Sequence, residues 1–515
     1  MANAAPAPAK LPSTIPYIIG NEGCERFNFY GMRNILTPFL VGTLLLHLPE
    51  GQRVLAAKDV FHTFVIGVYF FPLLGGWLAD RHFGKYPTIF WLSLVYCLGN
   101  ALLALFPHNL AGFYAGLLLI ALGSGGIKPL VASFVGDQFD ASNKHRAKGV
   151  FDAFYWIINF GSFFASLLMP MALRSYGPSV AFGIPGVLMF IATFVFWLGR
   201  KQYVRVPPAA PNRDSFVSVV RTALGTHAEG QGNLGSFVAG LGLALGLGTF
   251  FFIGRLGFVA CFCLALVLVL ACGGWGTARQ LERAKGLHSE EAIEGVRSVL
   301  RILILFFLTT PFWSLFDQKA STWILQANLM QRPSWFLPAQ MQALNPALVM
   351  VLIPFNSFVT WPALKRFFGY EPTSLARMGA GIFFSGLAWV VIGFLQVAVE
   401  RGPVHIAWQM VPYVFLTLGE VLVSATGLEF AYSQAPPSMK GTIMSFFYLS
   451  VTIGNLWVLL MNASVKSPAV TARMVQAGVS VTAFQMFFFA GFAFLAALAF
   501  AAYAKRYTLV DHYRS

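Results

Sequence analysis

Fourteen apolar runs, each long enough to cross a lipid bilayer, occupy most of this 515-residue chain. A membrane-spanning helix needs about 20 predominantly apolar residues, and inside lipid its backbone groups must be hydrogen-bonded within the helix itself. With 57% hydrophobic and 11% charged residues, the chain leaves no stretch for a soluble domain. We therefore predict an all-α polytopic membrane protein whose helices pack against one another in lipid.

The runs fall into two sets of six with a pair between them. Basic residues gather in the connectors that follow the even-numbered runs, for example Arg81 and Lys85 after the second. Cytoplasmic connectors carry an excess of Lys and Arg, so we expect these connectors and both termini in the cytoplasm. The predicted division is an N-terminal tail at 1–14, a first bundle at 15–200, a linker with two extra spans at 201–297, a second bundle at 298–505 and a C-terminal tail at 506–515.

Charged residues interrupt the first run. Glu22, Arg26, Tyr30 and Arg33 are three or four residues apart and therefore share one face of a helix, with Glu25 beside them. Each charge would cost roughly 2.5–3.5 kcal/mol at a helix centre in lipid, so these side chains must face a partner or a watery cavity. One interpretation is a structural salt-bridge ladder. The interpretation we favour is a transport pathway, in which carboxylates exchange protons and guanidinium groups hold an anionic substrate group.

Residues 22–30 resemble the E-x-x-E-R-F-x-Y-Y signature on the first helix of the proton-coupled oligopeptide transporters, with Phe29 in place of its first Tyr. The resemblance implies a major facilitator fold, with two six-helix bundles and two additional transmembrane helices between them, as in bacterial members. Four more stretches resemble signatures of this family, namely 75–86, 123–139, 151–161 and 418–436.

A faint internal repeat agrees with two related halves. Phe134 and Gln138 in the fourth run recur at one constant offset as Phe430 and Gln434 in the tenth. Two halves related by an axis along the membrane normal are the plan of the major facilitator fold, which places the substrate site between them near the midplane.

Buried charges of opposite sign occur in the two halves. Lys128 lies deep in the fourth run, too far from either end for its side chain to reach water easily. The repeat offset brings Glu420 of the tenth run within one helical turn of the equivalent position, and Asp317 in the seventh run is a further acid that needs a cation. A cavity with one positive and one negative wall suits a zwitterion such as a peptide.

The family resemblance also implies roles for single residues. Proton coupling falls to Glu22, Glu25 and Arg26, and Arg33 pairs with Asp317 in a salt bridge that closes the outer gate. His62 matches a histidine of animal members, and its role stays open. The implied peptide-binding set is Arg26, Tyr30, Arg33, Tyr69, Lys128, Asn159, Trp313, Asn345 and Glu420.

We therefore expect a proton-coupled symporter that imports di- and tripeptides and peptide-like compounds by alternating access across the cell inner (plasma) membrane. Its expected partners are small peptides, protons and the lipid bilayer. We expect a monomer, with no nucleic acid, metal or cofactor, because the proton gradient drives transport. No G-x-S-x-G, H-E-x-x-H or G-x-x-x-x-G-K-[ST] motif occurs, which argues against an enzyme or an ATP-driven pump. The alternatives are a family member that carries another small organic or inorganic ion, and a membrane receptor.

Overall fold

The computed structural model describes residues 11–139, 147–208, 212–226, 232–434, 439–476, 478 and 480–507. Within these ranges the chain is helical, with two isolated β-bridges and no strand. Most of the two predicted tails, at 1–10 and 508–515, lies outside the described residues.

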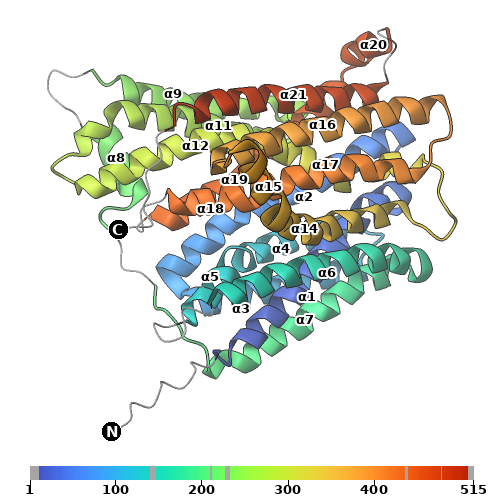
Figure 1. Cartoon of the computed structure of the whole chain (residues 1–515), viewed down its shortest axis with the longest axis horizontal. Helices are drawn as coiled ribbons and strands as arrows, with labels where there is room; N and C mark the ends of the chain where they lie inside the picture. Colours follow the sequence, from blue (N-terminus) through green and yellow to red (C-terminus); the bar gives the residue numbers. More distant parts are fainter. Residues whose placement is uncertain are drawn as a thin grey trace. The chain divides into compact units, whose positions relative to one another are not determined.

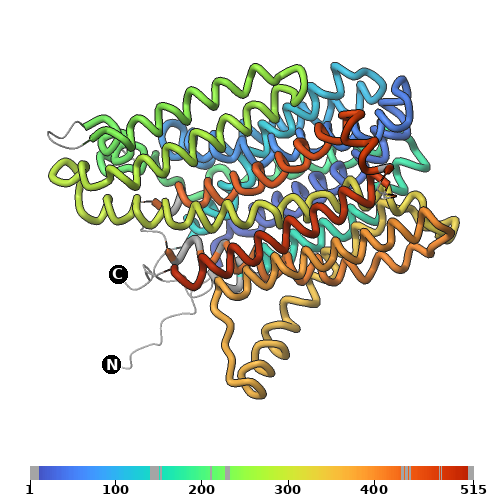
Figure 2. Tube along the Cα trace, turned by 90° about the horizontal axis from the view of Figure 1, so that it is seen from above, coloured from blue at the N-terminus to red at the C-terminus, as the bar shows by residue number. Residues whose placement is uncertain are grey.

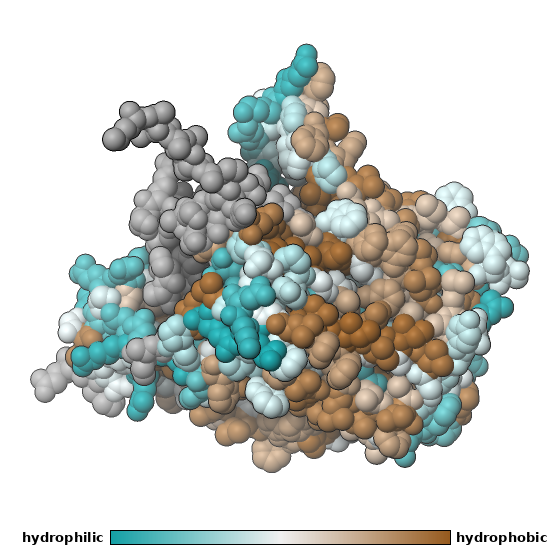
Figure 3. Space-filling view, turned by 90° about the horizontal axis from the view of Figure 1, so that it is seen from below, coloured by the Kyte–Doolittle hydropathy of each residue, from teal (hydrophilic) through white to brown (hydrophobic). Residues whose placement is uncertain are grey.

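Thirteen helices in this part of the chain are long and apolar enough to cross a membrane. The first helix, α1 (Ile15–Phe39), has 25 residues, and its polar and charged side chains lower its hydropathy. Together they make the fourteen spans that the sequence predicts, and the all-α membrane fold is confirmed. Hydrophobic side chains cover a broad area of the face shown in Figure 3, as a surface in contact with lipid requires.

The chain forms two compact units. Unit 1 comprises Met1–Ala57, Gly67–Ala210 and Pro333–Val351, and unit 2 comprises Lys58–Ile66, Pro211–Arg332 and Leu352–Ser515. Besides α1, unit 1 contains α3 (Lys85–Leu105), α4 (Leu110–Ile127), α5 (Leu130–Asp137), α6 (Ala147–Tyr176) and α7 (Pro178–Leu198), all labelled in Figure 1.

Two helices contribute residues to both units, namely α2 (Glu50–Leu78) and α14 (Leu344–Phe355). The other helices of unit 2 are α8 (Phe216–Gly225), α9 (Leu234–Gly248), α10 (Ile253–Leu256), α11 (Phe258–Gln280), α12 (Glu290–Asp317), α13 (Thr322–Asn328), α15 (Trp361–Phe368), α16 (Ser374–Arg401), α17 (Met410–Glu420), α18 (Thr426–Ser433), α19 (Lys440–Val465), α20 (Pro468–Gln476) and α21 (Val481–Ala504).

A segment from the second half of the sequence belongs to unit 1 because it is hydrogen-bonded to α6. The Gln340 side chain donates to the Leu167 carbonyl at 3.0 Å, and the Arg174 guanidinium donates to the Ser334 carbonyl at 3.0 Å. These bonds place the start of α14, with Asn345, in unit 1.

Glycines allow the helices of unit 1 to approach one another closely. A Cβ atom added to Gly75 of α2 would lie 2.0 Å from the carbonyl oxygen of Gly125 in α4, a distance at which two atoms overlap. The backbones of α2 and α4 therefore touch at this point, which leaves no room for a side chain. This contact fixes the position of the α4 end that carries Lys128.

The two extra spans, α9 and α11, form an antiparallel pair within unit 2 (Figure 2). They too meet at small residues, since a Cβ on Gly235 would lie 2.5 Å from the Gly276 carbonyl oxygen. Such contacts are typical of helix packing in lipid.

Candidate functional site

The charges of α1 form a compact buried cluster in unit 1. The Arg26 Nε lies 2.6 Å from a Glu22 oxygen and 3.1 Å from a Glu25 oxygen. Both glutamate side chains are almost fully buried, at 1% and 0% exposure. Two carboxylates thus share one guanidinium, as the helical spacing predicts for Glu22.

The carboxylates of this cluster are not fully hydrogen-bonded. The second oxygen of Glu22 is buried and has no hydrogen-bond partner among the described residues, and neither Glu25 oxygen has one beyond its ion pair. If both acids were ionised, the cluster of two glutamates and Arg26 would bury one net negative charge, which is costly in a low-dielectric environment. A single proton on either carboxylate would remove that charge.

Lys128 projects onto aromatic rings of the same unit. Its Nζ lies 3.8 Å from the centre of the Phe29 ring and 5.3 Å from that of Tyr69. The Arg33 guanidinium lies 6.0 Å from the centre of the same Phe29 ring. Contacts of this kind stabilise a cation by roughly 0.5–2 kcal/mol. The structure therefore brings together Tyr69, Lys128 and Arg33, which the sequence singled out separately.

The backbone around Lys128 is interrupted. Helix α4 ends at Ile127, Lys128 forms its C-cap, and α5 starts at Leu130 after Pro129. Proline cannot donate a backbone hydrogen bond, so it ends the regular helix at this point. Lys128 thus stands at a break inside a membrane span rather than within an unbroken helix.

The remaining predicted binding residues of unit 1 lie on different elements. Tyr30 on α1 contacts the edge of the Phe29 ring at 5.3 Å between centroids. Asn159 on α6 donates to the Tyr155 carbonyl one turn earlier at 3.0 Å, so one of its amide hydrogens is used within its own helix. Asn345 is buried near the start of α14, at 7% exposure.

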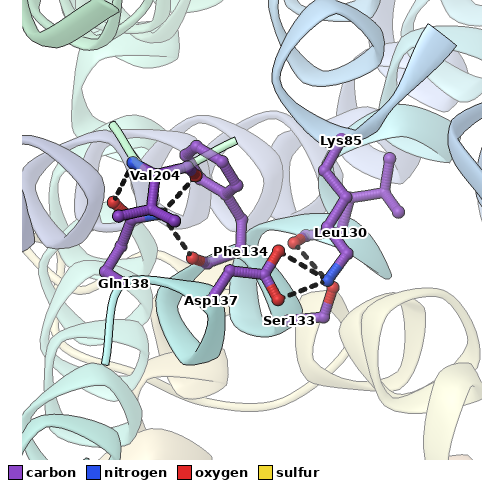
Figure 4. A network of polar contacts seen from close by, with 7 residues as sticks. All are labelled: Lys85, Leu130, Ser133, Phe134, Asp137, Gln138 and Val204. Atoms are coloured by element: carbon purple, nitrogen blue, oxygen red, sulfur yellow. Dashed lines mark hydrogen bonds and ion pairs between the residues drawn. The ribbon is translucent and has the colours of Figure 1, made fainter. Parts of the chain in front are cut away.

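Two stretches that resemble family signatures, 75–86 and 123–139, are joined by hydrogen bonds (Figure 4). Lys85 contacts both carboxylate oxygens of Asp137, at 2.8 and 2.7 Å, and so joins α3 to α5. The Gln138 side chain exchanges two hydrogen bonds with the backbone of Val204, at 3.1 and 3.0 Å. The Gln138 bonds join the chain after α7 to the end of α5. These contacts explain why a charged residue, Asp137, and an amide, Gln138, occur at the end of α5.

Unit 2 contains the second-half candidates. Trp313 on α12 is buried and packs edge-on against Phe447, with 5.8 Å between ring centroids, and a Cβ on Gly454 would lie 2.6 Å from the Trp313 Cβ. The Trp313 ring nitrogen has no hydrogen-bond partner among the described residues. The Trp313 ring is therefore packed between α12 and α19.

Asp317 and His62 belong to one buried hydrogen-bond network. Asp317 accepts a bond from the Asn455 amide nitrogen at 2.7 Å, and the Asn455 amide oxygen lies 2.6 Å from His62 Nδ1. The other ring nitrogen, Nε2, lies 3.0 Å from the Ser321 hydroxyl. Both nitrogens of a fully buried histidine are therefore engaged.

Glu420 is half-buried at the end of α17, directly before a π-helical turn at Val421–Ala425. Such turns within α-helices are frequent at functional sites. Glu420 thus stands, like Lys128, at an irregular point inside a span. The predicted gate pairs Arg33 of unit 1 with Asp317 of unit 2 and stays a prediction.

Sequence reasoning missed two residues of these sites. Phe29 was noted as a departure from the family signature, whereas its ring contacts both Lys128 and Arg33. Asn455 was not singled out, because a single amide in an apolar run does not reveal which residue it meets. A search for amides buried inside spans would have identified it as a candidate.

A family model described as the POT family matches residues 86–478. The in meso crystal structure of the POT family transporter PepTSo is 64% identical, with a TM-score of 0.96, and covers 98% of this chain and 100% of its own. A crystal structure described as an auto-inhibited POT family peptide transporter is 63% identical, with a TM-score of 0.95, over 98% of this chain and 99% of its own.

Curated sequence relatives are more distant. Solute carrier family 15 member 1 of Oryctolagus cuniculus is 32% identical over an alignment of 421 residues, and the match covers 76% of this chain and 53% of that protein. The chain spans about half the length of the curated relatives it matches.

Proposed function

Because this chain belongs to the POT family, a family of transporters, we propose that it is a proton-coupled symporter that imports di- and tripeptides and peptide-like compounds by alternating access. It is a multi-pass membrane protein. We place it in the cell inner (plasma) membrane with both termini in the cytoplasm, because the Lys- and Arg-rich connectors mark that side. We propose that it acts as a monomer. It needs no cofactor or metal, since the proton gradient supplies the driving force.

The observation that carries this proposal is the pair of buried glutamates around Arg26. With one guanidinium for two carboxylates, the cluster is neutral only when it holds one proton. Protonation of Glu22 or Glu25 weakens that carboxylate's attraction for Arg26 and leaves its guanidinium available to a carboxylate of the substrate. Proton binding and peptide binding then favour each other, which is the linkage that symport requires.

The peptide carboxylate has further cationic and hydrogen-bonding partners in unit 1. Lys128 is held over aromatic rings, which attract its ammonium group. Tyr30 is a further partner of the carboxylate, and Tyr69 lines the pocket. Asn159 and Asn345 bind the amino end and the first carbonyl of the peptide, and Arg33 completes the proposed binding set in this unit. In unit 2, Glu420 takes the peptide amino group and Trp313 provides an apolar wall, and such a wall accepts many side chains.

The test is uptake of a labelled dipeptide into proteoliposomes under an inward proton gradient. The parent should accumulate peptide above the external concentration. Glu22→Gln and Glu25→Gln should lose this accumulation while still exchanging internal for external peptide without a gradient. The control is Glu371→Gln, because Glu371 is an exposed acid outside the spans that pairs with Lys365. If both α1 variants concentrate peptide as well as the control does, the coupling assignment is wrong.

The same assay separates the alternative functions. A family member that carries another small ion would show uptake of that ion, and excess dipeptide would not compete with it. A receptor would bind peptide without moving it into the vesicle.

A further inference from the structure

Unit 2 contains a groove between α16 and α21, which run side by side (Figure 1). Its volume is about 850 Å³, within the range of roughly 300–1,000 Å³ found for sites that hold small ligands. Small residues make its floor and sides. They include Ala376, Gly379, Ala380, Ala497 and Ala501.

The two ends of the groove differ in chemistry. At one end the rings of Phe383 and Phe494 meet, with 5.3 Å between their centroids, and close it with apolar surface. At the other end are Thr373, Lys505 and Tyr507, where the two helices leave the span. The groove is therefore apolar along its length and polar at one mouth.

The length of the groove matches one leaflet of a bilayer. The lining residues of α16 extend from Thr373 to Phe383, and those of α21 from Phe494 to Lys505. At 1.5 Å rise per residue these stretches are about 15 and 16 Å long, close to half of the ~30 Å hydrocarbon thickness. An acyl chain that enters at the polar mouth would thus end at the Phe383 and Phe494 rings.

The mouth carries positive charge. Lys505 and the adjacent Arg506 are both exposed, and neither makes an ion pair with any residue that the structure describes. Tyr507 is positioned there by ring contacts with Phe430 at 5.6 Å and Tyr503 at 6.3 Å between centroids. Basic residues at the end of a span attract anionic headgroups.

We propose that this groove, here called the α16/α21 groove, is a binding site for an anionic phospholipid, with one acyl chain between the helices and its phosphate at Lys505. Small residues leave the space for the chain, and the aromatic pair sets its depth. By the positive-inside pattern this lipid belongs to the cytoplasmic leaflet.

Native mass spectrometry of the full chain tests the site. The protein is delipidated in detergent and mixed with equal amounts of phosphatidylglycerol and phosphatidylcholine with identical chains. The parent should retain one phosphatidylglycerol in preference to phosphatidylcholine. Lys505→Gln should lower that preference about fivefold, as expected for one basic residue at an anionic surface. Arg279→Gln is the control, because Arg279 is an exposed base at the end of α11 and does not line the groove.

A second pair of variants tests the space rather than the charge. Ala501→Trp fills the groove and should abolish lipid retention, whereas Ala502→Trp, on the same helix about 100° further round and outside the groove, should keep it. Both alanines are exposed, so the core does not have to accommodate the added ring. Should Ala501→Trp not yield a monodisperse protein, Ala376→Phe fills the groove from the α16 side.

Several results would overturn the assignment. Equal lipid retention by Ala501→Trp and Ala502→Trp would show that the groove does not hold the lipid. Equal loss of preference in Lys505→Gln and Arg279→Gln would show unspecific attraction to the surface. A dimer that disappears with Ala501→Trp while lipid retention is unchanged would identify a second copy of the chain as the occupant.

Discussion

The contact between α2 and α4 offers a sharp test of how the Lys128 site is held. In Gly75→Ala the new methyl group would lie 2.0 Å from the Gly125 carbonyl oxygen, and real Cβ atoms essentially never come closer than 3.0 Å. The two helices must separate by about 1.0 Å, the difference between these distances. Overpacking of this kind typically costs about 1–3 kcal/mol of stability, which exceeds the gain of up to about 1 kcal/mol expected when alanine replaces glycine in a helix.

Dipeptide uptake should fall by more than the loss of folded protein alone would explain. Gly125 lies three residues before Lys128, and Tyr69 is on the same helix as Gly75, so the separation moves the cation relative to its ring. A displacement of about 1 Å at a binding site can lower a rate on the order of 100-fold. We therefore expect dipeptide uptake to fall by at least tenfold while part of the protein still folds.

The adjacent glycine provides the matched control. A Cβ on Gly76 has no atom within 4 Å, so Gly76→Ala should keep uptake and leave thermal stability unchanged or slightly higher. The assays are the melting temperature in detergent and initial dipeptide uptake in proteoliposomes. If Gly75→Ala melts and transports like Gly76→Ala, the close approach of α2 and α4 is not what positions Lys128.

Three other predictions follow from the same contacts. Phe29→Leu removes the ring beneath Lys128 and should weaken dipeptide binding about two- to tenfold, measured by competition for uptake; affinity equal to the parent's would contradict a role for this ring. An N-acetylated dipeptide should compete far less well than the free dipeptide, and in Glu420→Gln this difference should shrink; an unchanged difference would remove Glu420 from amino-group recognition. Hydrogen bonds from the Ser289 hydroxyl and from His288 lower the pKa of Asp214 from its ordinary value of 3.8. The ionised carboxylate therefore stabilises the folded chain above pH 3.8, and this stabilisation is lost as the pH falls below 3.8 and the carboxylate gains a proton. Hydrogen-exchange protection of 212–226 should therefore fall below pH 3.8, and Asp214→Asn should show the reduced protection already at pH 7.

Much of the fold could be predicted because membrane spans depend on local sequence. Long apolar runs have few alternatives to a helix in lipid, and the face shared by Glu22 and Arg26 follows from helical periodicity alone. Lys128 was identified for the same reason, since a charge deep inside an apolar run requires an explanation.

The rest depends on contacts between distant parts of the chain. Asn455 meets Asp317 across 138 residues of sequence, and no local pattern specifies that partner. The segment at 333–351 belongs to unit 1 through bonds to α6, although its sequence position is in the second half. Phe29 was misjudged because a family signature records the usual residue and not the contact that its ring makes.

The network around His62 can hold the ring in either charge state. The Asn455 amide nitrogen donates to Asp317, so its oxygen must accept, and His62 Nδ1 is then the donor. In the neutral ring Nε2 accepts from the Ser321 hydroxyl, which is 3.0 Å away. When Nε2 gains a proton it donates to that oxygen, and the hydroxyl turns to the Gln318 carbonyl at 3.4 Å. Protonation of Nε2 therefore needs one hydroxyl rotation, and both ring nitrogens stay hydrogen-bonded. The α1 cluster differs, because there one proton makes two carboxylates and one guanidinium neutral.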